Sequence, residues 1–188
     1  MPETKFRKIN NLIGWLLFSV ALLTYGLTVE PTASYWDAGE YISTSAKLQV
    51  GHPPGAPFFQ MMGAVFSLFA SNNESIAIAV NFLSVVSSAF VILFLFWSTT
   101  LFLKKISKKN NFTNDTNILL SSSIGALAFT FSDSFWFNAV ETEVYALAML
   151  FLSATFWCGL RWEKDFNNKR GDKWLLLICF LIGLSFGV

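Results

Sequence analysis

Five stretches without a charged residue constrain the fold more than any other feature of this sequence. The longest, residues 76–103, runs for 28 residues without Asp, Glu, Lys or Arg. A helix that crosses a bilayer needs about 20 mostly apolar residues. We therefore predict an all-α fold, a polytopic transmembrane helical bundle. Its five spans are expected over residues 12–29, 76–103, 117–137, 144–160 and 174–188.

Composition agrees with a membrane protein. Of the 188 residues, 54% are hydrophobic and only 13% are charged, too few to cover a water-facing surface. Disorder and a basic nucleic-acid binder are excluded. Cys158 and Cys179 lie inside apolar runs and His52 is the only histidine, so we expect neither a disulfide framework nor a zinc site. The last apolar run reaches Val188 without a cap, which predicts the N-terminal part of a longer protein.

The basic residues predict the orientation, because Lys and Arg gather on the cytoplasmic side of membrane proteins. With five spans and the N-terminus inside, only Lys47 falls on the outer side. We therefore predict a multi-pass protein of the cell (inner) membrane with a cytoplasmic N-terminus. The inner residues are Lys5, Arg7, Lys8, Lys104, Lys105, Lys108, Lys109, Arg161, Lys164, Lys169, Arg170 and Lys173.

The acidic residues are divided the other way. Twelve of the 13 basic residues and five of the 12 acids lie inside, so the inner side carries +7 and the outer side −6. Orientation depends little on acids, so the outer ones need another explanation. They are Glu30, Asp37, Glu40, Glu74, Asp133, Glu141 and Glu143.

The first outer loop, residues 30–75, is expected to hold interfacial helices. A helix over Ser34–Val50 would place Tyr35 and Trp36 as anchors at the membrane surface. The 13-residue apolar run 58–70 is too short for a span and predicts an interfacial or re-entrant helix.

Asp37 and Glu40 are three residues apart in this loop and would share a helix face with Tyr41. Two such carboxylates could polarise a hydroxyl, bind a divalent cation or form a solvated face. His52 precedes Pro53-Pro54-Gly55, which holds its backbone extended. This segment is either a rigid turn or a way to aim a donor at a phosphate or hydroxyl.

The second outer loop, residues 133–143, ends in Glu141-Thr142-Glu143, with Tyr145 just beyond it. The two acids would complement the dipole of the helix that follows. Acids at a membrane boundary are costly, however, and by default are candidates for function.

The motifs YWDAGEYI, GHPPGAPFF and FWFNAVETEVYAL together resemble a bacterial multi-spanning family of formerly unknown function. That family is similar to the GT-C glycosyltransferases, and to protein O-mannosyltransferases in particular. The resemblance implies a GT-C-like bundle. It also implies transfer of a sugar, such as mannose, from a polyprenyl-phosphate-linked donor to a protein hydroxyl or other acceptor on the extracytoplasmic side. The partners would be this donor, membrane lipid and an acceptor protein or glycan, without nucleic acid.

By position, the resemblance implies that Asp37 activates the acceptor hydroxyl and that Glu40 is its acidic partner. Glu141-Thr142-Glu143 resembles the paired-acid motif of some relatives. The sequence departs from the closest pattern, because Ala38-Gly39 separates Asp37 from Glu40. Without later spans, the fragment alone is expected to be inactive.

The resemblance makes Asp37 and Glu40 the expected catalytic residues, and the chemistry of transfer can be described independently of it. A carboxylate can take the proton of a Ser or Thr hydroxyl as the new bond forms. A lipid-phosphate leaving group needs a cation or donors, and the outer side offers only Lys47 and His52. The further positive charge would come either from Arg or Lys in absent parts of the protein or from a bound divalent metal ion. The candidate ligands of such a metal are Asp37, Glu141 and Glu143. The expected substrate-binding residues are His52, Tyr41, Glu141, Glu143 and Tyr145.

Two other classes of function remain open from the sequence. One is a transporter or flippase component, although such proteins place ionisable residues near the bilayer midplane and here the acids lie at span ends. The other is a non-catalytic membrane scaffold.

Overall fold

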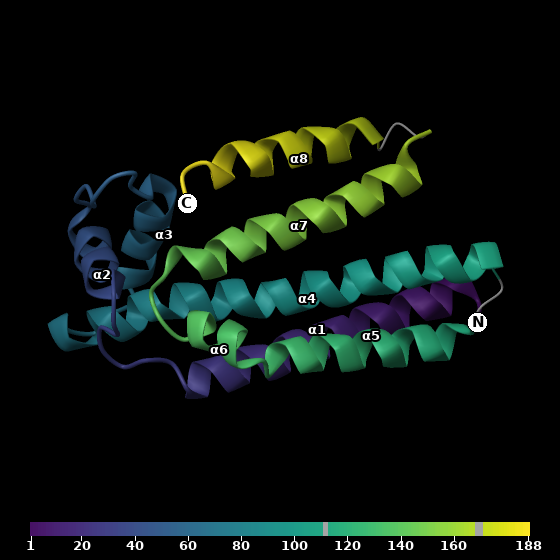
Figure 1. Ribbon diagram of the computed structural model, residues 1–188, viewed down its shortest axis with the longest axis horizontal. Helices are drawn as coiled ribbons and strands as arrows, with labels where there is room; N and C mark the ends of the chain where they lie inside the picture. Colours follow the sequence, from purple (N-terminus) through teal and green to yellow (C-terminus); the bar gives the residue numbers. More distant parts are fainter. Residues whose placement is uncertain (111–112, 168–170) are drawn as a thin grey trace.

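The computed structural model describes residues 1–110, 113–167 and 171–188. Lys169, Arg170 and the side chain of Lys109, which the orientation argument counts, lie outside the described residues. The described chain is helical, without strands, so the predicted all-α class is confirmed (Figure 1). The helices are α1 (Glu3–Leu27), α2 (Ala38–Lys47), α3 (Pro57–Ser67), the 3₁₀ turn η1 (Asn73–Ser75), α4 (Ile76–Asn110), α5 (Asp115–Thr130), α6 (Asp133–Ala139), α7 (Val144–Asp165) and α8 (Gly171–Ser185).

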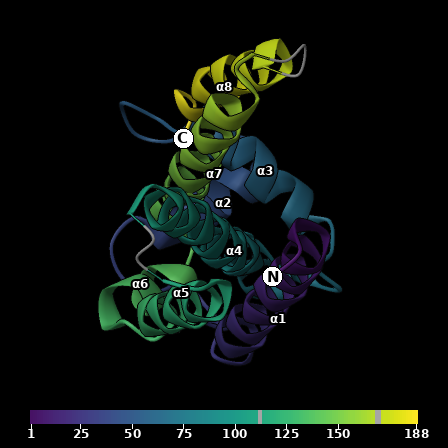
Figure 2. The same ribbon diagram turned by 90° about the vertical axis from the view of Figure 1, so that its right-hand side faces the viewer.

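Helix α4 is the centre of the bundle. It packs against α1, α5 and α7, while α8 packs on the outside of α7 (Figure 2). Its side chains Val85, Ile92 and Phe96 are buried in a core shared with α1 and α5. A helix that is apolar on all sides is expected at a bundle centre, because each of its faces meets a neighbour.

Three helices are long and apolar enough to cross a membrane: α1, α4 together with η1, and α7. The predicted third span, 117–137, is broken, because α5 ends at Thr130 and α6 starts at Asp133 with a bend of 66°. Ser132 and Asp133 favour a new helix start there, since their side chains compete for backbone groups and an acid suits a first turn. Counted as one span, this pair makes a fourth.

The predicted fifth span, 174–188, corresponds to α8, which has 15 residues. At 1.5 Å per residue it is about 22 Å long, less than the hydrocarbon core of about 30 Å. The residues just after α8 contact the start of α3, where the Phe58 amide donates to the Gly187 carbonyl at 2.7 Å.

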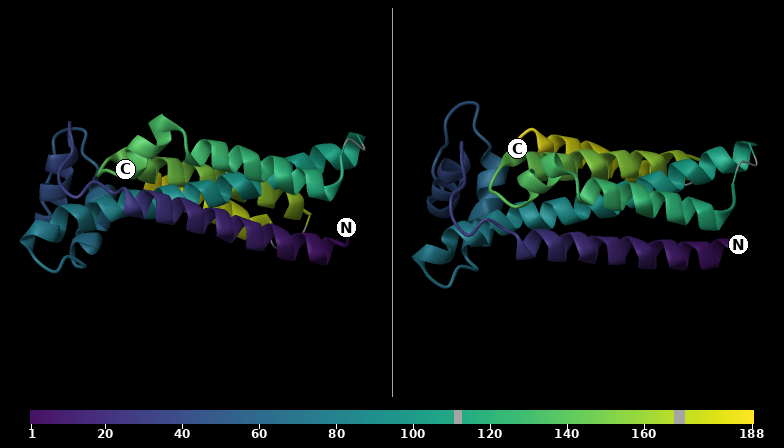
Figure 3. Two further views of the ribbon diagram at one scale, coloured as in Figure 1. Left: turned by 90° about the horizontal axis from the view of Figure 1, so that it is seen from below. Right: turned by 60° about the horizontal axis from the view of Figure 1, so that its bottom comes forward.

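Helices α2 and α3 lie across one end of the bundle (Figure 3). The predicted helix Ser34–Val50 is too long at both ends, since α2 covers Ala38–Lys47. Trp36 before it and Leu48 after it have the positive φ values of 60° and 49°, which a right-handed helix cannot contain. Tyr35 and Trp36 are accordingly exposed ahead of the helix. The apolar run 58–70 forms α3, and Pro57 occupies its first position, where the missing amide hydrogen costs nothing.

The opposite end of the bundle gathers basic residues and their partners. The N-terminal ammonium lies 3.2 Å from Asp115 Oδ2, and Lys164 Nζ lies 3.4 Å from Glu3 Oε1. Lys105 pairs with Glu163. These contacts join the N-terminus to the start of α5, the first turn of α1 to the last turn of α7, and α4 to α7. Cys158 and Cys179 are both free thiols.

Candidate active site

Asp37 is the residue immediately before α2, at the end of the connection from α1. The left-handed backbone of Trp36 turns the chain there, and the Asp37 side chain makes no capping bond to the helix. About half of the side chain is exposed. The carboxylate is therefore free to accept a proton or a ligand from outside.

Glu40 holds His52 by two hydrogen bonds. The His52 backbone amide donates to Glu40 Oε1 at 2.7 Å, and His52 Nδ1 lies 2.9 Å from Oε2. The hydrogen bonds from His52 lower the pKa of Glu40, and the same carboxylate raises the pKa of His52. With Nδ1 facing Glu40, the Nε2 atom is directed outward, 4.0 Å from Asp37 Oδ2. The imidazole is thus fixed in direction, and it binds its proton more tightly than a free histidine does.

Tyr41 lies among the predicted acids. Its ring packs edge-on against Phe59 at 5.3 Å and lies 6.4 Å from the His52 ring. Burial raises the pKa of its hydroxyl, and the negative charges of Glu143, Asp37 and Glu40 raise it further. The phenol therefore stays protonated and can donate a hydrogen bond.

Glu141, Thr142 and Glu143 form the short connection between α6 and α7. Glu141 and Glu143 are only 4% and 7% exposed, although both are carboxyl groups. Burial raises the pKa of Glu143 to about 7, helped by the nearby charges of Glu141 and Asp37. Near neutral pH Glu143 is therefore about half protonated. Tyr145, in the first turn of α7, is exposed beside them.

The best-defined candidate ligand group for a cation differs from the predicted one. Ligand atoms of Asp37, Glu40 and His52 all lie within 4.8 Å of one another, whereas the sequence suggested Asp37 with Glu141 and Glu143. Both Glu40 oxygens are hydrogen-bonded to His52 and each keeps a further lone pair, while Asp37 Oδ2 and His52 Nε2 lie 4.0 Å apart. A carboxylate that holds a histidine by Nδ1 while Nε2 faces a ligand is common at metal sites.

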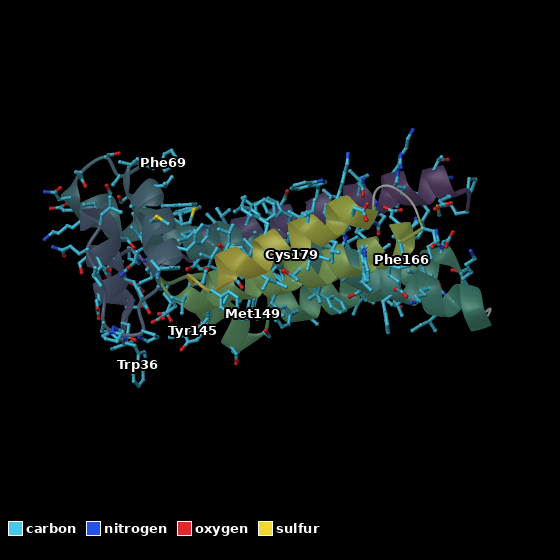
Figure 4. All side chains as sticks on the ribbon, turned by 90° about the horizontal axis from the view of Figure 1, so that it is seen from above. Trp36, Phe69, Tyr145, Met149, Phe166 and Cys179 are labelled. Carbon is cyan, nitrogen blue, oxygen red and sulfur yellow. The ribbon has the colours of Figure 1, made fainter. Side chains whose placement is uncertain are left out.

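An apolar groove leads toward this region from the side of the bundle. A cavity of about 470 Å³ lies between α4 and α7 and reaches Phe129 of α5. A second one, of about 220 Å³, is lined by Asn138 and Tyr145 and shares Phe129 and Met149 with the first. Trp36, Tyr145 and Met149 lie in a row along one edge of the molecule (Figure 4). The two cavities therefore lie next to each other, and the second reaches Tyr145, two residues beyond Glu143.

The structure brings the seven predicted site residues to one end of the molecule, and their chemical roles stay predictions. Two neutral residues at this end, Asn81 and Gly51, were not predicted from the sequence. Asn81 of α4 bonds both outer loops. Gly51 lies so close to Gln60 and Glu40 that a Cβ would come within 2.7 Å and 3.3 Å of their side chains. Asn81 had one signal, since it is the only amide side chain in the run 76–103.

Comparison with known proteins identifies the family. Residues 37–188 match the family described as "Protein O-mannosyl-transferase TMEM260 N-terminal domain". The chain belongs to this family. The matched residues begin at Asp37 and include every residue of the predicted site. Membership supports the O-mannosyltransferase part of the sequence resemblance. A bacterial source and the GT-C relationship stay predictions.

Two curated relatives of the TMEM260 family are similar over most of this chain. Protein O-mannosyl-transferase tmem260 of Dictyostelium discoideum is 30% identical over 158 residues, which are 82% of this chain and 18% of the relative. Protein O-mannosyl-transferase TMEM260 of Mus musculus is 27% identical over 170 residues, 90% of this chain and 22% of the relative. The chain thus spans about a fifth of these relatives. No solved structure matches it.

Proposed function

We propose that this chain contributes the acceptor-activating part of a membrane O-mannosyltransferase. The enzyme would move mannose from a polyprenyl-phosphate-linked donor to a protein hydroxyl on the extracytoplasmic side. The proposal rests on one observation. At one end of an apolar bundle lie Asp37, the Glu40–His52 pair and buried Glu143. The family supports the type of reaction, since its curated members are named O-mannosyl-transferases.

In this proposal Asp37 is the general base. Its carboxylate is half exposed and makes no capping bond, so an acceptor hydroxyl can reach it. As the hydroxyl oxygen attacks the anomeric carbon, its proton passes to Asp37 and the bond from that carbon to the phosphate oxygen breaks. Glu40 acts through His52, whose protonated ring faces the same space as Asp37. The positive ring would offset the negative charge that develops on the leaving lipid phosphate.

The donor would reach the site from the bilayer. A polyprenyl chain is apolar and its phosphate is charged, so it suits an apolar groove that ends at polar groups. The groove between α4 and α7 opens toward Tyr145, whose hydroxyl can bond a sugar or phosphate oxygen. Glu141, Glu143 and Tyr41 would then contact the sugar. A divalent cation bound by Asp37 and by Nε2 of a neutral His52 would be an alternative to the charged ring as a means of binding the phosphate.

The charges at the two ends of the bundle support the predicted orientation. The basic end, which holds the N-terminus, would face the cytoplasm and the acidic end would face outward. The transfer reaction would then take place on the extracytoplasmic side, as the sequence predicts.

The test is Asp37→Asn in the full-length protein, assayed in isolated membranes with a lipid-linked mannose donor and a protein acceptor. We expect transfer to fall by about 100-fold or more, because a general base contributes about 10²–10⁴-fold. Asp133→Asn is the matched control, an exposed acid in the first turn of α6 at the same end. Unchanged transfer in Asp37→Asn would exclude the proposed role. Solute flux through reconstituted vesicles without any transfer would favour a transporter instead.

A further inference from the structure

Asn81 lies in the second turn of α4 and is only 1% exposed. Its Nδ2 donates to the carbonyl of Glu30 at 2.6 Å and to that of Thr32 at 3.1 Å. Its Oδ1 accepts from the hydroxyl of Thr142. Both donor hydrogens of the amide and one acceptor site are therefore used. Every partner lies in an outer connection rather than in a neighbouring helix.

The partners of Asn81 belong to the two connections that carry the predicted site residues. Glu30 and Thr32 belong to the connection between α1 and α2, which leads to Asp37. Thr142 stands between Glu141 and Glu143 in the connection between α6 and α7. Asn81 thus ties the segment that carries the proposed base to the segment that carries the buried acids.

Only one other bond joins the same two connections among the described residues. The Glu30 amide donates to the Val140 carbonyl at 2.9 Å. The remaining bonds of Glu30 and Thr32 to each other are local and exposed. The relative position of the two connections therefore depends on Asn81, on this main-chain contact and on the bond that Trp136 Nε1 of α6 donates to Thr28 Oγ1 at 2.9 Å.

We propose that Asn81 is the positioning residue of the site, which, through Thr142, sets the distance between the Asp37 segment and the Glu141–Glu143 segment. The inference rests on the proposed function for its catalytic consequence, but the link between the two connections does not. An amide suits this place because it supplies two donors and an acceptor without a net charge. Buried polar residues in a span are costly and are kept where they serve a function.

The test compares variants in the full-length protein. Thr142→Val removes the hydroxyl while keeping the side-chain shape, and leaves both Asn81 donors in place. Asn81→Leu removes all three bonds. Thr142→Ser restores the hydroxyl. Ser88→Ala is the matched control, because Ser88 is buried in the same helix and its hydroxyl finds no partner within the described part of the chain.

The first measurement is hydrogen exchange of the two connections, residues 28–36 and 140–143, in detergent without substrate. We expect Thr142→Val and Asn81→Leu to speed exchange in both segments together, while Thr142→Ser and Ser88→Ala leave it unchanged. Unchanged exchange of residues 28–36 in Thr142→Val would overturn the inference. If Asn81→Leu does not fold, Thr142→Val decides the point alone.

The second measurement is transfer of mannose as a function of donor concentration and pH. A misplacement of about 1 Å can cost about 100-fold in rate. We expect kcat to fall about 10- to 100-fold in Thr142→Val with little change in KM, and Thr142→Ser to restore it. The pH midpoint that arises from Glu143 should also move to lower pH as that side chain gains solvent. A wild-type protein that does not transfer mannose would refute the proposed function, while the exchange measurement would still decide this inference.

Discussion

The two ends of the bundle hold their charges in opposite ways. At the basic end, the side chains of Lys105 and Glu163 are 62% and 53% exposed and those of Lys164 and Glu3 are 55% and 78% exposed, while Asp115 keeps 20% of its side chain in solvent. At the acidic end, Glu141 and Glu143 are almost completely buried, and both outer connections are bonded to the buried side chain of Asn81.

Such a difference is expected between charges that set the orientation of a membrane protein and charges that belong to a site. Exposed lysines cost little and can bind lipid headgroups while they set the topology. A buried carboxyl loses hydration, and the protein must offset that loss elsewhere. The basic end needs no further explanation, whereas the buried acids at the other end are what the proposed site would require.

The largest difference between the two ends is expected in the rate of mannose transfer when His52 is replaced. Replacing His52 with Gln removes the ring that Glu40 holds toward Asp37, and with it the positive charge proposed to face the leaving phosphate. We expect mannose transfer to fall by about 100-fold, as for other groups that stabilise developing charge. Lys105→Gln at the basic end should leave the rate unchanged. Equal rates for wild type and His52→Gln would remove His52 from the site.

The second contrast is the pH dependence of stability that Glu143 produces. Its pKa is about 7 in the folded chain against 4.5 in the unfolded chain, so the folded state binds the proton more tightly. Stability from this group is fully present below about pH 4.5 and declines as pH rises to about 7, by about 3 kcal/mol in total. The thermal midpoint of wild type should therefore drop between pH 5 and pH 8 relative to that of Glu143→Gln.

Two further groups must be separated in that experiment. The raised pKa of His52 also adds stability that disappears as pH rises, starting from about pH 6.5. The lowered pKa of Glu40 acts in the opposite direction, since its contribution is lost as pH falls below the ordinary carboxyl range. Both groups are present in wild type and in Glu143→Gln, so the difference between the two proteins isolates Glu143. Parallel curves for the two proteins would contradict a buried, neutral Glu143.

Sequence reasoning located the spans better than the turns. The centres of α1, α4 and α7 follow from charge-free runs, because in a bilayer apolar composition alone selects helix. The break between α5 and α6 depends on Ser132 and Asp133, where a local preference for a helix start competes with an apolar surrounding. A sum over hydropathy does not contain that competition.

The site shows a similar division. Acids and a single histidine are conspicuous in an apolar chain, so the candidate residues could be named from the sequence. That these residues lie close together could not be derived from the sequence, because it depends on contacts between loops far apart in the chain. Asn81 and Gly51 are neutral, and the role of each becomes visible only with its neighbours: Thr142 is 61 residues from Asn81, and Gly51 lies against Gln60.

A smaller effect is expected at Gly51. In Gly51→Ala the new methyl group would lie 2.7 Å from Gln60 Nε2, and Gln60 is held by its bond to Thr44 at 3.0 Å. We expect a loss of about 1–2 kcal/mol, as for other overpacked sites, read as a lower thermal midpoint by Trp fluorescence. Gly183→Ala in α8 is the control, since nothing lies within 4 Å of its added methyl. Equal losses in both variants would show that the site end is no more tightly packed than α8.

The smallest effect is expected for the ion pair between Lys105 and Glu163 at the basic end. Both side chains are more than half exposed, so water and salt screen their attraction. Glu163→Gln should change the free energy of unfolding by less than about 1 kcal/mol, and added salt should reduce even that difference. A thermal midpoint measured at low and high salt for wild type and Glu163→Gln tests this. A loss of stability as large as that caused by a variant at the acidic end would mean that the ion pairs of the basic end also stabilise the fold strongly. The contrast between the two ends would then be wrong.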